Sequence, residues 1–256
     1  MADTMRGKTV LVMGIANRWS LAYAIAQALA REGAGLCVTY QAERVKKAVE
    51  ELAAGLGGAR VYPCEVSQDE SIAGLFERLQ EDVGRLDGVV HSLAFAQKED
   101  LERPFEQTSR AGFAQALDVS AYSLVAIAHR AAGLMTGGGG IVTLSYLGAT
   151  RVVPNYNVMG VAKAALEASV RYLASELGPR GIRVNAISAG PIKTASARAI
   201  KDFSSILEQV AQRAPLRRVT DPAEVADTAL FLLGDGGRGI TGDTLFVDSG
   251  YHILGV

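Results

Sequence analysis

Residues 9–32, TVLVMGIANRWSLAYAIAQALARE, determine the expected fold. Residues 9–13 form a short apolar run rich in β-branched side chains, which is typical of a buried strand. Gly14 begins a tight turn, and residues 20–32 carry apolar side chains at helical spacing on one face. This succession of strand, turn and helix predicts one βα unit of a parallel sheet.

The same succession is repeated along the rest of the chain. Short apolar runs that alternate with longer helical stretches indicate a parallel sheet covered by helices on both faces. We therefore expect an α/β fold, a single Rossmann-type, doubly wound domain over residues 1–256 with a parallel seven-stranded sheet. The expected strands span residues 9–13, 36–40, 59–64, 88–92, 140–145, 182–188 and 244–248. The expected helices span residues 20–32, 42–56, 67–83, 111–135, 155–177 and 221–233.

The composition excludes several classes of protein. The chain has 256 residues, with 26 Lys and Arg against 27 Asp and Glu and a net charge of −1. Its 49% hydrophobic and 21% charged residues fit neither a disordered chain nor a basic nucleic-acid-binding module. Gly or charge interrupts each apolar run before the roughly 18–20 residues of a membrane span, and residues 1–8 lack the apolar segment of a secretory signal.

Cysteine and histidine usage argues against a metal site. Cys37 and Cys64 form no CxxC pair, and His91, His129 and His252 are scattered along the chain. We therefore expect no bound metal, and neither nucleic acid nor a membrane as a partner.

Two stretches without a strand or helix pattern are longer than connections usually are. They cover residues 94–110 and 189–205, and each follows an expected strand. In open parallel sheets, ligands bind beyond the carboxyl ends of the strands. We expect both stretches to border a ligand site at that edge.

The turn after the first strand is suited to a dinucleotide. It keeps one glycine, Gly14, in place of a full GxGxxG, and Ser20 is expected to cap the following helix, whose N–H groups would face a pyrophosphate. The second strand ends at Gln41, where an acidic residue is usual for NAD and an arginine for NADP. Gln41 is neutral and Arg44 follows it, so NADH is favoured while NADPH remains the alternative.

Tyr156 and Lys163 form the pair with the clearest chemical meaning. A spacing of seven residues places them on one helix face two turns apart. An ammonium group beside the phenol would favour phenolate, lower the pKa of Tyr156 and make it a strong donor to a developing oxyanion. A boundary tyrosine and a surface lysine would show the same spacing, but the position after the fifth strand favours function. Tyr146 ends that strand, either as an edge aromatic or as a site residue.

The blocks around these residues resemble one family. A typical short-chain dehydrogenase/reductase has Tyr-x3-Lys, and Gly160 breaks that pattern here. The Tyr-x6-Lys spacing, LSYLGA at 144–149, PNYNVMGVAK at 154–163 and RVNAISAGPI at 183–192 resemble the bacterial NAD(P)H-dependent enoyl-[acyl-carrier-protein] reductases, a divergent branch of that superfamily. The resemblance runs from about residue 7 to residue 250.

This resemblance implies a fold, a reaction and partners. It implies the strand order 3-2-1-4-5-6-7, a homotetramer and a cytoplasmic enzyme of type II fatty-acid elongation. NADH would pass a hydride to the β-carbon of a trans-2-enoyl thioester on acyl carrier protein, and the enolate would then be protonated at its α-carbon. A substrate-binding lid is implied near residues 191–210, with Lys201 at a docking position for the acidic carrier protein.

The resemblance also assigns residue roles. Tyr156 would hydrogen-bond the thioester carbonyl and stabilise the enolate, Lys163 would bind the nicotinamide ribose and support Tyr156, and Tyr146 would complete the catalytic set. The implied cofactor-binding residues are Gly14, Ser20, Leu21, Gln41, Glu65, Val66, Leu93, Lys163, Ile192, Lys193, Thr194, Ala195 and Ser196. The implied substrate-binding residues are Ala96, Tyr146, Tyr156 and Met159.

Some residues depart from the family pattern, and two other functions stay open. Glu65 stands where an aspartate is common, and Ala94 where a glycine is common. A ketone or alcohol oxidoreductase of the same superfamily would use a serine such as Ser145, but it requires Tyr-x3-Lys. A non-catalytic dinucleotide-binding protein would be expected to lack Tyr156 or Lys163, and both are present.

Overall fold

The computed structural model describes residues 4–194 and 203–255. Within these residues the core is a seven-stranded sheet in the order β3-β2-β1-β4-β5-β6-β7, with every neighbouring pair parallel. This confirms the α/β class and the strand order. The strands are β1 (Thr9–Met13), β2 (Gly35–Tyr40), β3 (Arg60–Pro63), β4 (Gly88–His91), β5 (Gly139–Ser145), β6 (Ile182–Ala189) and β7 (Thr244–Val247).

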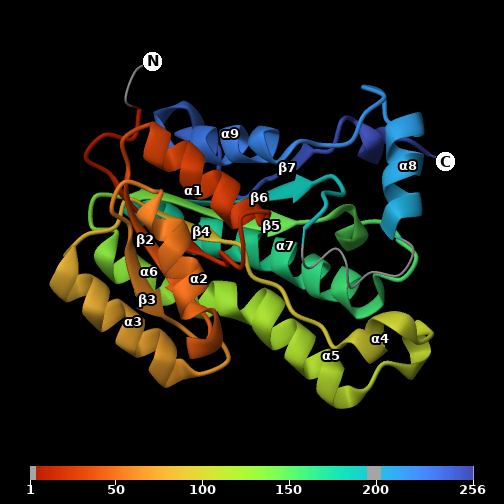
Figure 1. Ribbon diagram of the computed structural model, residues 1–256, viewed down its shortest axis with the longest axis horizontal. Coiled ribbons are helices and arrows are strands. Elements are labelled where there is room, and N and C mark those ends of the chain that lie inside the picture. Colours follow the sequence, from red (N-terminus) through yellow and green to blue (C-terminus); the bar gives the residue numbers. More distant parts are fainter. Residues whose placement is uncertain (1–3, 195–202, 256) are drawn as a thin grey trace.

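Helices cover both faces of the sheet (Figure 1). One apolar layer packs α1 (Leu21–Arg31), α2 (Glu43–Ala54) and α9 (Pro222–Leu233) against the strands. The opposite layer contains side chains of α3 (Asp69–Asp82), α6 (Ser123–Leu134) and α7 (Asn157–Leu177). Both strand faces are therefore buried, which explains why the strands are continuous apolar runs without alternation.

The long helix expected over 111–135 is interrupted. It consists of α5 (Arg110–Leu117), a π-helical turn over Asp118–Tyr122 and α6. By length and composition, Arg110–Leu134 does reach the criterion for a membrane-crossing helix, contrary to the expectation that charge or Gly interrupts every such run. Core helices of soluble proteins meet the same criterion, and 44% of the apolar window is buried inside the protein.

The two stretches expected to be irregular contain short helices that periodicity did not indicate. The first holds α4 (Lys98–Glu102) and a 3₁₀ turn at Phe105–Gln107. The end of the second is the start of α8 (Phe203–Arg213), which buries Leu207 and Val210 on one face. In Figure 1, α4 and α8 both lie at the right of the view, beyond the ends of the central strands.

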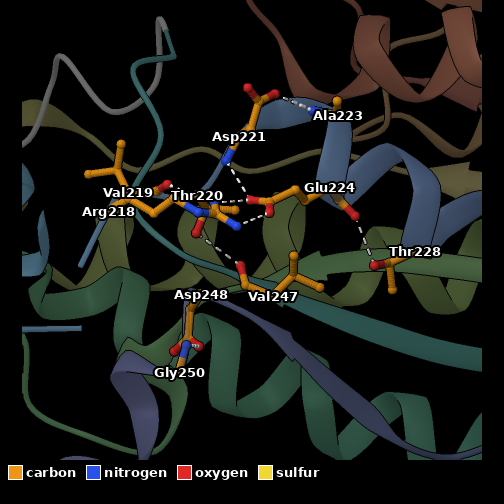
Figure 2. Close-up of polar contacts among 10 residues, drawn as sticks. All are labelled: Arg218, Val219, Thr220, Asp221, Ala223, Glu224, Thr228, Val247, Asp248 and Gly250. Carbon is orange, nitrogen blue, oxygen red and sulfur yellow. Dashed lines mark hydrogen bonds and ion pairs between the residues drawn. The ribbon is translucent and has the colours of Figure 1, made fainter. Parts of the chain in front are cut away.

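Hydrogen bonds fix the start of α9 to the end of β7 (Figure 2). Arg218 donates to both carboxylate oxygens of Glu224, at 2.8 and 2.5 Å. The Asp221 N–H donates to Glu224 at 2.9 Å, and the Asp221 side chain accepts an N–H two residues ahead, forming a capping box. The Thr220 hydroxyl donates to the Val247 carbonyl at 3.2 Å and so links the start of α9 to β7. The Arg218–Glu224 ion pair and the capping box stabilise the same helix end.

Candidate active site

Two adjoining cavities lie at the carboxyl ends of the strands. The larger has a volume of about 560 Å³ and runs along the ends of β1, β2, β3 and β4 to Lys163. The smaller has a volume of about 370 Å³ and lies against Tyr146 and Tyr156. Residues common to both linings are Leu21, Ala94, Phe95, Ser145 and Thr194. The site therefore has two arms, both lined mainly by apolar atoms, and Ser145 borders both of them; charged and polar side chains such as Gln41, Glu65 and Lys163 line the larger arm.

Gly14 lines the larger cavity. It has a φ of +99° and follows β1 at the point where the strand order reverses toward β4. A β-carbon at this position would lie 2.0 Å from the Ser92 carbonyl oxygen. Only glycine combines this backbone angle with this close approach, so the turn packs directly against Ser92, just after β4.

Ser20 occupies the N-cap position of α1 but does not cap it. Its hydroxyl donates to the Asn17 carbonyl at 2.7 Å. The predicted side-chain cap is wrong because the preceding turn, which also places the Ser20 N–H on Asn17, takes the hydroxyl as a donor. The start of α1 still lines the larger cavity, where it presents the positive end of the helix.

Gln41 and Glu65 lie together at the far end of the larger cavity. The Gln41 amide donates to the Glu65 carboxylate at 2.7 Å. Burial opposes ionisation of Glu65, but hydrogen bonds from Gln41 and Ser67 outweigh it and lower the pKa of the carboxyl group. Arg44 lines the same end. A carboxylate suits ribose hydroxyls and a guanidinium suits a phosphate, so partners for both kinds of cofactor are present.

Tyr146 and Tyr156 form the wall of the smaller cavity. Their ring centroids are 4.9 Å apart at an interplanar angle of 68°, an edge-to-face contact. Tyr156 immediately precedes α7, and Tyr146 immediately follows β5. Two elements that are adjacent in the fold thus fix the two rings against each other at the cavity.

The phenol of Tyr156 is neutral, contrary to the expectation from its spacing to Lys163. Burial raises the pKa of Tyr156, with Tyr146 adding to the rise and no contribution from Lys163. Burial also raises the pKa of Tyr146 to about 12. The predicted lowering of the Tyr156 pKa is wrong because desolvation of the buried phenol has the largest effect. A neutral phenol retains its proton and can donate it in a hydrogen bond.

Lys163 is buried and points to the end of β5. Its Nζ donates to the Leu144 carbonyl at 2.7 Å, and it also lines the larger cavity. Burial lowers the pKa of Lys163 to about 8, opposed by the charge of Glu167. The ammonium group therefore lies at the larger cavity, next to the end of β5, with donors left for a ligand.

Most of the predicted site residues line one of the two cavities. Lys193 is exposed and lines neither cavity, and its role as a cofactor ligand stays a prediction. Ala195, Ser196 and Lys201 lie outside the described residues. The predicted residues that line the larger cavity are Gly14, Ser20, Leu21, Gln41, Glu65, Val66, Leu93, Lys163 and Thr194. Those that line the smaller cavity are Leu21, Ala96, Tyr146, Tyr156, Met159, Ile192 and Thr194.

Several lining residues were not predicted from the sequence. In the smaller cavity these include Phe95, Leu101 and Gly190, and in the larger cavity Gln115 and Val119. The stretch 94–110 was expected to border the site, but it has no periodicity that shows which side chains turn inward. For the lining residues in this stretch, their position after a strand was the only signal in the sequence.

Gly148 makes room for the Tyr156 ring and provides a test of its placement. A β-carbon at position 148 would lie 2.3 Å from Cδ1 of that ring. We expect Gly148→Ala to displace the phenol and lower kcat by about 10–10²-fold, with little change in dinucleotide affinity. Steady-state kinetics and a dinucleotide titration measure the two effects. Gly74→Ala, where a β-carbon meets nothing within 4 Å, is the control, and equal losses in both variants would contradict this placement.

Comparison with known proteins gives one family. Residues 14–252 match the family described as enoyl-(acyl carrier protein) reductase. The chain is 54% identical to the NADH enoyl-acyl-carrier-protein reductase FabI of Bacillus cereus, over 99% of this chain and 100% of that protein. It is 50% identical to the NADPH enzyme FabI of Staphylococcus aureus strain MRSA252, over 98% of each.

Solved structures agree with this result. The crystal structure of the Bacillus cereus reductase with NADP+ and an indole naphthyridinone matches with a TM-score of 0.98 at 54% identity, covering all of both chains. The Anaplasma phagocytophilum reductase in complex with NAD matches with a TM-score of 0.95 at 48% identity, covering 100% of this chain and 96% of that one. The chain therefore belongs to the enoyl-(acyl carrier protein) reductase family.

Proposed function

We propose that this protein reduces the trans-2 double bond of an enoyl thioester carried by acyl carrier protein, as a step of fatty-acid elongation. NADH is the proposed hydride donor and NADPH the alternative. The observation that carries the proposal is the position of the neutral Tyr156 in an apolar cavity that opens at Ser145 into a cavity suited to a dinucleotide. The names of the relatives support the same reaction.

The larger cavity has the features that a nicotinamide dinucleotide needs. The positive end of α1, beside the Gly14 turn, suits a pyrophosphate, and the Gln41–Glu65 pair suits the adenosine ribose. Lys163, at the other end, would hold the nicotinamide ribose through its remaining N–H groups. When bound, the cofactor would supply a hydride to the β-carbon of the substrate.

Tyr156 would act on the charge that hydride transfer creates. Addition at the β-carbon moves negative charge onto the thioester oxygen, and the phenol O–H would donate to that oxygen. Such a donor is effective because it is already in place in a site with little water. Protonation of the α-carbon then completes the reduction.

The apolar walls of the smaller cavity would hold the acyl chain. Ala96, Leu101, Met159 and Phe203 line it beside the two tyrosines. These side chains exclude water from the path between the dinucleotide and the substrate. Residues 195–202, the centre of the proposed lid, lie outside the described residues.

The ketone or alcohol oxidoreductase reading is less well supported by this geometry. It would need a lysine at position 160, four residues after Tyr156. A β-carbon at Gly160 would lie 2.8 Å from the Gly148 carbonyl oxygen, so a side chain there requires the backbone to move. Ser145 alone does not restore that mechanism.

Substrate choice tests the proposed function. Purified protein is mixed with crotonyl-coenzyme A or acetoacetyl-coenzyme A, and oxidation of NADH and of NADPH is followed separately by absorbance. We expect oxidation with the crotonyl thioester, faster with NADH. Oxidation only with the acetoacetyl thioester would favour the ketone reductase, and no oxidation by folded protein that binds NADH would favour a non-catalytic role.

Replacing Lys163 should affect cofactor binding as well as turnover. We expect Lys163→Ala to weaken NADH binding by about tenfold, since hydrogen bonds from a charged group contribute about 1.5–3 kcal/mol. Fluorescence titration with NADH measures the dissociation constant. Lys8→Ala, which removes an ion pair with Asp235 away from both cavities, is the control. Unchanged NADH affinity in Lys163→Ala would show that the ribose assignment is wrong.

Three further assignments remain predictions. The chain has small residues along α7 that permit close helix packing, which supports the proposed homotetramer. Binding of acyl carrier protein near Lys201 is proposed from the family resemblance alone. The cytoplasmic location is proposed on the same basis.

A further inference from the structure

Glu167 is a buried acidic residue without a part in the mechanism described above. It lies on α7 with only 7% of its surface exposed. Its Oε1 accepts a hydrogen bond from the Ser145 hydroxyl at 2.5 Å. A carboxylate is rarely buried unless it is paired or hydrogen-bonded. The groups around Glu167 therefore indicate its role.

Glu167 and Lys163 bind consecutive residues of β5. Lys163 donates to the Leu144 carbonyl at 2.7 Å, and Glu167 accepts from the side chain of Ser145. The spacing of four residues places the two charged side chains on one face of α7, one turn apart. Two successive turns of α7 are thus hydrogen-bonded to the end of β5. Tyr146 is the next residue after that strand.

We propose that Glu167 is a positioning residue that acts through Lys163: its carboxylate, one helical turn away and held by Ser145, keeps the buried Lys163 side chain protonated for its hydrogen bond to the cofactor ribose. The proposal rests on the proposed function, because it takes the bound ribose to be the ligand of Lys163. Substrate and cofactor need not touch Glu167 for this role.

The charges around the pair agree with this role. Burial lowers the pKa of Lys163 to about 8, and the Glu167 charge raises it. Burial raises the pKa of Glu167, opposed by the Ser145 hydrogen bond and by the charges of Arg171 and Lys163. His91 from β4 also faces Lys163, but burial lowers its pKa to about 3, so it stays neutral above pH 6. Loss of the Glu167 charge should therefore let Lys163 lose its proton at lower pH.

The pH dependence of NADH binding tests this proposal. Dissociation constants are measured by fluorescence titration from pH 6 to pH 10 for the unmodified protein, Glu167→Gln and Lys163→Met. For the unmodified protein, affinity should fall as pH rises through the pKa of Lys163. In Glu167→Gln, which keeps shape and the acceptor for Ser145, the fall should begin about one pH unit lower or more. In Lys163→Met this fall should be absent.

Matched variants separate charge from shape. Glu176→Gln removes an exposed carboxylate from the same helix and should leave the pH profile unchanged. Glu167→Asp keeps the charge but shortens the side chain, and its profile should lie closer to that of the unmodified protein than Glu167→Gln does. A uniform loss of affinity in Glu167→Gln, with no shift along the pH axis, would overturn the proposal. Absence of NADH binding in the unmodified protein would instead contradict the proposed function.

Discussion

Tyr156→Phe is expected to lower kcat by about 10²–10³-fold and to leave NADH affinity nearly unchanged. The variant keeps the ring and its edge-to-face contact with Tyr146, at 4.9 Å between centroids, and loses only the O–H. Because burial holds the phenol neutral, this O–H is the donor available to a developing enolate oxygen. Stopped-flow measurement of a single turnover with crotonyl thioester, together with an NADH titration, separates chemistry from binding.

Tyr172→Phe is the matched control for this experiment. Tyr172 lies on α7, the helix that follows Tyr156, with 77% of its surface exposed, and it lines neither cavity. We expect that variant to behave as the unmodified protein. If Tyr156→Phe retained full turnover, the carbonyl would have another donor, and Tyr146 would be the next residue to test.

Gly14→Ala is expected to raise the NADH dissociation constant by about 10²-fold and to lower the melting temperature by several degrees. A β-carbon there would lie 2.0 Å from the Ser92 carbonyl oxygen, so β1 and β4 must separate at the place where the dinucleotide would bind. Displacement by about 1 Å is enough for losses of this order. Backbone strain of about 1–3 kcal/mol would lower the free energy of unfolding by that amount. In a domain of this size, each kcal/mol lowers the melting temperature by about 2–4 °C.

Gly57→Ala separates the two causes of the Gly14 effect. Gly57 also has positive φ, at +70°, but a β-carbon there meets nothing within 4 Å. Its substitution should lower stability slightly and leave NADH binding intact. Isothermal titration and thermal denaturation of both variants measure the difference. Equal NADH affinity in the two variants would show that the Gly14 turn does not border the cofactor.

Much of the fold could be predicted because the apolar strands are short and sharply bounded. The seven expected strands match β1 to β7 within one or two residues at each end. The order of the strands in the sheet was predicted from the family resemblance, because an apolar run does not show which strands lie beside it. The π-helical turn at Asp118–Tyr122 could not be predicted, because one inserted residue in a helix leaves the apolar pattern almost intact.

The sequence could predict where a site residue lies when a motif fixes the backbone, but it could not predict which partner a side chain bonds. Gly14 directly follows β1, Tyr156 directly precedes α7 and Lys163 lies on α7, as their motifs predict, and all three line the cavities. Lys193 turns outward, and the Ser20 hydroxyl bonds Asn17 in preference to the helix. The lowered pKa expected for Tyr156 failed because spacing gives proximity to Lys163 but not the extent of burial.

Isotope transfer tests the central claim most directly. Crotonyl thioester is reduced with NADH carrying deuterium at C4, and separately with ordinary NADH in deuterated water, and the product is analysed by NMR. Reduction by the proposed route places the hydride-derived deuterium on the β-carbon and the solvent-derived deuterium on the α-carbon. Acetoacetyl thioester is treated in the same way, and cofactor-derived deuterium found on the alcohol carbon of its hydroxyacyl product, with no reduction of crotonyl thioester, would contradict the account.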